Sequence, residues 1–219
     1  MLRLGVVSGQ GLLRSFFQIF LRPSKYRPFI AFRVEASSRS KIENVQFKVR
    51  DYHPEDFNTL WAIDQSCFDP EIAYSRYELQ VYLRRPGAFT LIADLDGQGL
   101  QARNNGPLSK EVASSQSSIL AFVVAESSPR GMGHIITIDV RPAIRRHHVG
   151  SALLNAAEHR LRTAKCHAVR LETAVDNASA ISFYKRHGYD VIKVIPHYYS
   201  TGVDALLLEK NLLSVESSS

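Results

Sequence analysis

The sequence predicts one α/β or α+β domain in which strands and helices surround a single sheet. Three observations lead to this prediction. Segments of strand and helix character alternate in the order βααβββαβαββ between residues 45 and 212. A chain of 219 residues is long enough to bury one sizeable core. Its 45% hydrophobic and 22% charged residues are typical of a globular protein and not of a disordered or fibrous one.

A strand and two helices come first. Residues 45–50 alternate between apolar and polar, which is typical of a half-buried strand. Apolar residues at helical spacing over residues 54–67 predict a helix, and a proline-containing stop follows it. Ser75 and Glu78 have the spacing of a capping box, so they predict a second helix over residues 75–85.

Three strands and a long helix form the middle of the domain. Short apolar runs predict strands at residues 88–93, 119–124 and 134–140. Between the first two of these, residues 97–118 are polar and without periodicity, so they predict a flexible loop. An amphipathic pattern predicts a helix over residues 149–161.

A strand, a short helix and two more strands complete the order. Residues 169–175 alternate as a strand does. Asn177 is placed to cap the next helix and Gly188 is placed to end it. Residues 189–195 and 203–208 predict the last two strands.

The formal net charge of +6 comes from one end of the chain. Residues 1–41 hold eight basic residues and one acidic residue, whereas the remaining 178 residues hold 19 basic and 20 acidic ones. A nucleic-acid-binding surface is therefore disfavoured after Lys41. We expect a basic extension over residues 1–44, a folded domain over residues 45–212 and a polar tail over residues 213–219.

Several explanations of the extension stay open. Its apolar stretch at residues 11–21 contains Arg14, is too short to span a membrane, and is not closely followed by a cleavage site of small residues. A transit peptide, a surface-seeking helix and a start codon placed too far upstream all fit. The two cysteines, Cys67 and Cys166, form no disulfide framework, so we expect free thiols in a cytoplasmic protein.

The most informative stretch runs from Ile138 to Leu154, where a strand ends, a basic turn follows and a helix begins near Gly150. The N-terminus of a helix has free backbone N–H groups and the positive end of the helix dipole, which together bind anions such as a pyrophosphate. The turn adds positive charge through the run Arg145, Arg146, His147 and His148. We therefore expect an anion-binding turn here.

This stretch resembles the motif Arg/Gln-x-x-Gly-x-Gly/Ala of the GNAT superfamily of acyl-CoA-dependent N-acetyltransferases. Arg145 and Gly150 match the motif, and His148 stands where the middle Gly occurs. The resemblance covers about residues 45–212 and includes the family's helix pattern Asn-x-x-Ala-x-x-x-Tyr at residues 177–184. It implies the GNAT fold, a mixed central sheet of six to seven strands flanked by about four helices.

Within the superfamily the chain is most similar to the ribosomal-protein-alanine N-acetyltransferases and related N-terminal acetyltransferases. Glu172 precedes Tyr184 by twelve residues, as it does in that group, and residues 68–75 and 196–199 resemble its substrate-binding segments. The resemblance implies direct transfer of acetyl from acetyl-CoA to the α-amine of a protein N-terminus, such as that of a ribosomal protein. Two alternatives stay open: an acetyltransferase of a small-molecule amine, and a non-catalytic acyl-CoA-binding module.

The resemblance also implies a role for each matched residue. Glu172 would be the base, directly or through one water, for an amine that titrates near ~8, and Tyr184 would protonate the CoA thiolate. Asn177 would bind the pantetheine arm or cap its own helix. A splay between the fourth and fifth strands would admit the pantetheine, and backbone N–H groups of the fourth strand would meet the oxyanion. Further contacts with CoA would come from Ile138, Asp139, Val140, Arg145, Arg146, His147, His148, Val149, Gly150 and Ser151.

The acceptor peptide would be bound by four aromatic residues, namely Phe68, Tyr74, Tyr198 and Tyr199. Structural interpretations compete with these roles, because Glu172 could pair with Arg170 and the tyrosines could pack as ordinary core or sheet-edge residues. No metal site is expected, because the histidines lack the spacing of metal ligands: His147, His148, His159 and His167.

Overall fold

The computed structural model describes residues 46–68, 70, 73–95, 117–199 and 202–213. They form one seven-stranded sheet in the order β1-β2-β3-β4-β5-β7-β6, which confirms the predicted α/β class with a mixed sheet. The strands are β1 (Phe47–Asp51), β2 (Ala88–Leu95), β3 (Ile119–Ser127), β4 (Met132–Val140), β5 (Ala168–Ala174), β6 (Asp190–Ile195) and β7 (Ala205–Asn211). The helices are α2 (Phe57–Cys67), α3 (Arg76–Leu83), α5 (Val149–Thr163) and α6 (Ala178–Arg186), with short 3-10 turns at Pro54–Asp56 and Pro142–Ile144.

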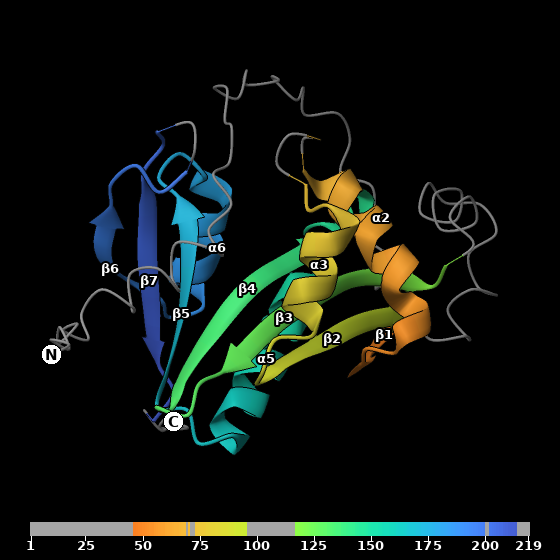
Figure 1. Ribbon diagram of the computed structural model, residues 1–219, viewed down its shortest axis with the longest axis horizontal. Coiled ribbons are helices and arrows are strands. Elements are labelled where there is room, and N and C mark those ends of the chain that lie inside the picture. Colours follow the sequence, from red (N-terminus) through yellow and green to blue (C-terminus); the bar gives the residue numbers. More distant parts are fainter. Residues whose placement is uncertain (1–45, 69, 71–72, 96–116, 200–201, 214–219) are drawn as a thin grey trace, which may run out of the picture.

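Helices cover both faces of the sheet (Figure 1). One face packs against α5 around Leu153, Leu154 and Leu161, which are all fully buried. The opposite face packs against α2 and α3, where Leu60 and Leu79 are fully buried. Each helix presents its apolar stripe to the sheet, as the periodicity predicts.

The sheet opens between its two parallel neighbours, β4 and β5. These strands pair only where Met132 faces Ala168, Gly133 faces Val169 and His134 faces Arg170. Beyond this point they diverge, and Figure 1 shows the resulting V-shaped splay. The backbone groups that face the splay on each strand have no sheet partner there, which is the arrangement that admits an extended ligand as an added strand.

The boundaries of several elements differ from the sequence prediction. The strand expected from residue 134 begins at Met132. Only Gly131 of the Gly-Met-Gly run has the positive φ of a turn, 72°, so the strand already includes the other two residues of the run. Gly133 lies inside the strand, where a Cβ would stand 2.7 Å from Cδ1 of Leu161. This glycine therefore allows α5 to approach the sheet closely and does not form a turn.

Some sequence predictions lie outside the described residues, namely the extension over residues 1–44, nearly all of the loop over residues 97–118, and residues 214–219 of the tail. None of the helices that the structure describes is long and apolar enough to cross a membrane.

Candidate active site

The predicted anion-binding turn joins β4 to α5. His148 is the N-cap of α5 and has a left-handed backbone with φ of 61°, and Arg146 also has a positive φ, of 70°. The first hydrogen bond of the helix runs from the N–H of Ala152 to the carbonyl of His148 at 3.0 Å. The N–H groups of the three preceding residues therefore point out of the helix end, as an anion site requires.

Basic side chains surround this helix end. Arg145, Arg146 and His148 are exposed, and His147 is partly so. A Cβ at Gly150 would stand 3.5 Å from Val140 and 3.7 Å from Phe183, which are ordinary contact distances. The turn thus offers an anion both positive charge and free backbone N–H groups.

The left-handed backbone of His148 explains why glycine suits this position. We expect His148→Gly to raise the free energy of unfolding by about 0.5–1 kcal/mol, because glycine adopts a positive φ without steric cost. Affinity for CoA should be equal or higher. Urea unfolding and calorimetric titration with CoA measure both quantities.

His53 offers a matched control for His148, because it is also an N-cap histidine but has an ordinary φ of −119°. His53→Gly should lower the free energy of unfolding, since glycine there only adds freedom to the unfolded chain. Destabilisation by His148→Gly would contradict the argument from backbone strain.

The backbone of β4 presents two of the three predicted oxyanion residues to the splay. The N–H of Arg141 donates to Leu120 of β3 at 3.1 Å. Because successive amides of a strand point to opposite sides, the amides of Ile138 and Val140 point away from β3 and into the splay. The amide of Asp139 points toward β3, so this residue can serve the site only through its side chain.

Glu172 lies on β5 at the point where the splay begins, and its partner is His134 of β4. Their atoms Oε2 and Nε2 are 2.7 Å apart. Arg170, the partner considered from the sequence, instead donates to Glu209 at 2.5 Å. Sequence reasoning missed His134, because only the pairing of β4 with β5 brings it to Glu172.

His134 also faces a second carboxylate, that of Glu126, with Nδ1 and Oε1 3.5 Å apart. Burial by itself would lower the pKa of His134. The hydrogen bonds with Glu126 and Glu172 outweigh burial and raise this pKa to about 9. The His134 ring is therefore positively charged near neutral pH.

Tyr184 lies on α6 and packs against the main core, with its ring centroid 5.5 Å from that of Tyr189. Burial, and secondly the charge of Asp139, raise the pKa of the Tyr184 hydroxyl above its ordinary value. The hydroxyl therefore stays protonated throughout the neutral range.

Asp139 is a buried carboxyl group near the same point, with 1% of its surface exposed. Its Oδ1 accepts a hydrogen bond from Oγ1 of Thr137 at 2.5 Å, whereas its Oδ2 has no hydrogen-bond partner among the described residues. Burial, and to a lesser extent the nearby charge of Asp64, raise the pKa of Asp139 to about 8. Sequence reasoning named Asp139 as a contact of CoA and as part of the strand whose backbone meets the oxyanion, but it did not foresee a buried carboxyl group here.

The loop between α2 and α3 is fixed at Tyr74 by three side chains of α2. Asp64 accepts the N–H of Tyr74 at 2.8 Å, and Trp61 and Gln65 donate to its carbonyl at 3.1 and 3.0 Å. At the other end of this loop the N–H of Phe68 donates to the carbonyl of Asp64 at 3.2 Å. Both predicted aromatic residues of the loop are therefore tied to the same helix.

The tyrosines predicted to bind an acceptor approach Glu172 from the connection between β6 and β7. The rings of Tyr198 and Tyr199 meet edge to face at 5.0 Å. Burial raises the pKa of Tyr198 most, and the charge of Glu172 raises it further, which places Tyr198 within electrostatic reach of that carboxylate. Tyr82 of α3, which the sequence did not single out, stacks against Tyr74 with centroids 5.0 Å apart.

Asn177 caps α6, as the structural interpretation of this residue predicted. Its Oδ1 accepts from the N–H of Ala180 at 3.1 Å and from the hydroxyl of Ser179 at 3.0 Å. A contact with pantetheine would then have to use its side-chain nitrogen, and this role stays a prediction.

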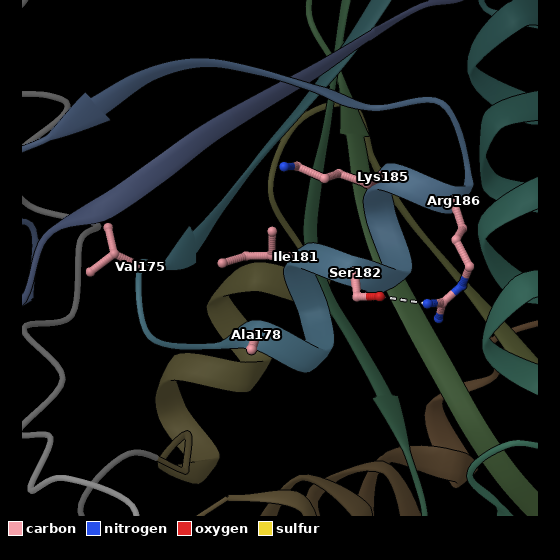
Figure 2. A pocket seen from close by; sticks show the side chains of 6 residues that line it. All are labelled: Val175, Ala178, Ile181, Ser182, Lys185 and Arg186. Carbon is pink, nitrogen blue, oxygen red and sulfur yellow. Dashed lines mark hydrogen bonds between the residues drawn. The ribbon is translucent and has the colours of Figure 1, made fainter.

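A hollow lies along α6, away from the predicted site residues (Figure 2). It is open, has a volume of about 560 Å³ and is lined by Val175, Ala178, Ile181, Ser182, Lys185 and Arg186. Ser182 and Arg186 are hydrogen-bonded to each other at 2.5 Å. None of the predicted site residues lines this hollow. Over the same described residues, no group of three or more His, Cys, Asp or Glu side chains is placed to hold a metal ion.

Curated relatives are similar to one part of this chain. An uncharacterised N-acetyltransferase of Methanocaldococcus jannaschii is 41% identical over 81 residues, which are 36% of this chain and 52% of the relative. An N-alpha-acetyltransferase of Sulfurisphaera tokodaii is 39% identical over 77 residues, which are 35% of this chain and 46% of the relative. The chain thus matches about half the length of these relatives.

Solved structures match more of the chain. The ribosomal-protein-S18-alanine N-acetyltransferase from Escherichia coli has a TM-score of 0.62 at 16% identity, over 80% of this chain and 99% of that one. Ard1 from Thermoplasma volcanium also has a TM-score of 0.62, at 24% identity, over 78% of this chain and 100% of that one. At these identities the likeness establishes the fold alone.

A family model covers most of the domain. The model of the acetyltransferase (GNAT) family matches residues 55–189, which include the predicted anion-binding turn, Glu172 and Tyr184. This match is longer than half of the chain and agrees with the splayed sheet. The protein belongs to the acetyltransferase (GNAT) family.

Proposed function

We propose that the protein transfers acetyl from acetyl-CoA directly to the α-amino group of a protein N-terminus. The observation that carries this proposal is the convergence of Tyr74, Tyr198 and the Glu172–His134 pair on one side of the splay. The pKa of Tyr74 is raised chiefly by burial and further by the neighbouring side chains of Tyr82, Asp139, Asp64 and Tyr198, so these residues lie close together. Similarity to proteins named N-alpha-acetyltransferases supports the choice of acceptor.

The splay and the turn fit acetyl-CoA. The turn at residues 145–151 would hold the pyrophosphate, and the unpaired backbone of β4 beyond His134 would hold the pantetheine. Acetyl-CoA supplies the activated acetyl thioester. The amides of Ile138 and Val140, which point into the splay, would stabilise negative charge on the acetyl oxygen.

The chain's own residues would move two protons. A peptide α-amine titrates near ~8, so its neutral form is accessible near neutral pH. Glu172 would accept a proton from the attacking nitrogen, directly or through one water. Tyr184 would donate its hydroxyl proton to the departing thiolate and recover a proton from solvent.

The finer proposal is that the acceptor begins with alanine or a similarly small residue, as some ribosomal proteins do. Tyr74, Tyr198 and Tyr199 would enclose the first residues of such an acceptor. We also place the protein in the cytoplasm, which the free thiols of Cys67 and Cys166 support.

A panel of amines tests the function. The protein and acetyl-CoA are incubated with an Ala-initiated peptide, with the same peptide blocked at its N-terminus but carrying a free lysine, and with small polyamines. Mass spectrometry should find one acetyl group on the α-amine of the first peptide only. Acetylation of the small amines alone would contradict the proposed acceptor, and binding of acetyl-CoA without turnover on any amine would contradict an enzymatic role.

A further inference from the structure

The carboxylate of Glu126 faces the far side of the His134 ring from Glu172. Glu126 of β3 lies directly opposite His134 in the register of β3 with β4. The Nε2 of His134 is 2.7 Å from Glu172, and its Nδ1 is 3.5 Å from Glu126. Carboxylates accept hydrogen bonds and do not donate them, so the ring satisfies both only as an imidazolium with two N–H groups.

Glu126 is itself held in place. Its Oε2 is 3.1 Å from Nε of Arg85, at the C-terminal end of α3. Arg85, Glu126, His134 and Glu172 therefore form a line of alternating charge from α3 across β3 and β4 to β5. Both carboxylates are mostly buried, with 18% and 17% of their side chains exposed, so solvent screens them little.

Arginine and tyrosine side chains of neighbouring elements also lie in this region of the described structure. Arg170, the neighbour of His134 across the β4–β5 pairing, donates to Glu209. Tyr82 and Tyr198 approach from α3 and from the β6–β7 connection, and burial keeps the Tyr198 hydroxyl protonated. Among the described residues, Glu126 and Glu172 are the carboxylates that raise the pKa of His134.

With Glu172 as its single partner, a neutral ring would suffice, since the N–H of Nε2 alone could donate to Glu172. The second carboxylate removes this option. We propose that Glu126 is a positioning residue of the acetyltransferase centre, which holds the His134 ring through Nδ1 and thereby fixes the side chain of Glu172, bound at Nε2, toward the acceptor amine. This inference rests on the proposed function for its catalytic meaning, but its structural part can be measured separately.

The test is a pH titration of the His134 ring in Glu126→Gln, in which NMR measures the pKa of the ring. Glutamine keeps the size and an acceptor oxygen but loses the charge. We expect the pKa of His134 to fall from about 9 by about one unit or more. The high-pH limb of kcat for peptide acetylation should move down by the same amount, with KM for the peptide little changed.

A matched control is Glu55→Gln, because Glu55 faces an exposed histidine, His53, at 3.7 Å outside the site. This change should leave the titration of His134 and the pH profile of kcat as they are. An unchanged pKa of His134 in Glu126→Gln would overturn the inference. A lower pKa without a shift in the pH profile would also overturn it, because Glu126 would then be a structural residue only.

Arg85→Gln gives a second test if Glu126→Gln does not fold. Loss of the arginine leaves the charge of Glu126 entirely to His134, so the pKa of His134 should rise. A fall or no change would contradict the proposal. Because the NMR titration needs no acceptor, failure of the proposed function appears separately, as the absence of acetylation by the unmodified protein on every amine of the panel.

Discussion

Glu172→Gln is expected to lower kcat for acetylation of an Ala-initiated peptide about 100-fold, the usual contribution of one general base. The amide keeps the hydrogen bond with His134 but accepts no proton from the attacking nitrogen. Tyr184→Phe should lower kcat at least about tenfold, because it removes the proton donor for the thiolate while retaining the packing against Tyr189. Steady-state kinetics with purified variants measure both effects.

Two variants of exposed residues serve as controls for this pair. Glu55 and Tyr77 lie outside the site, with 75% of the Glu55 side chain and 75% of Tyr77 exposed. Glu55→Gln and Tyr77→Phe should leave kcat unchanged. Affinity for CoA should be the same in Glu172→Gln and in the two controls, because none of these three residues is predicted to contact CoA. Unchanged kcat in Glu172→Gln and Tyr184→Phe would remove their assigned roles.

Asp139→Asn is expected to raise the free energy of unfolding by about 2 kcal/mol or more at pH 7. Burial raises the pKa of Asp139 from 3.8 to about 8, so the folded protein binds a proton that the unfolded chain releases. The stability of the unmodified protein should therefore fall as pH rises between these two values. Asparagine carries no charge, retains an oxygen for the hydroxyl of Thr137, and should abolish this part of the pH dependence.

His134 adds a second contribution to the pH dependence of stability, which also makes the free energy of unfolding fall as pH rises. Its pKa is raised from 6.5 to about 9 in the folded state, so its stabilising contribution is complete below the lower value and is lost as pH rises through the upper one. Urea unfolding of the unmodified protein and of Asp139→Asn at about pH 5 and about pH 9 separates the two groups. Equal pH dependence in both proteins would show that Asp139 is ionised in the folded state at neutral pH.

Local patterns in the sequence predicted the elements well because each pattern is a property of neighbouring residues. The hydroxyl of Ser75 accepts a hydrogen bond from the N–H of Glu78, and the carboxylate of Glu78 accepts one from the N–H of Ser75, as the capping-box spacing predicted. Gly188 ends α6 with a φ of 81°. The boundaries of β4 were harder to predict, since Gly133 is needed for contact with Leu161 and not for a turn.

The features of the site also divide into those that local sequence predicted and those that it did not. The basic turn before α5 is contiguous in the sequence, so its anion-binding character could be read directly, although the left-handed backbone of His148 could not. Glu172 and Tyr184 were found by resemblance. His134 beside Glu172 was not found, and Asp139 was predicted only as a contact of CoA, not as a buried carboxyl group near Tyr184.

The sequence by itself determined the order of the elements, the basic helix start and the caps, because periodicity, charge runs and capping act over a few residues. Only the tertiary structure decided that Glu172 pairs with His134 and that Arg170 pairs with Glu209. These partners depend on which strands are neighbours, on their register and on which side chains share a face. They are set by long-range pairing within the sheet. The spacing of residues along the sequence does not indicate which strands pair.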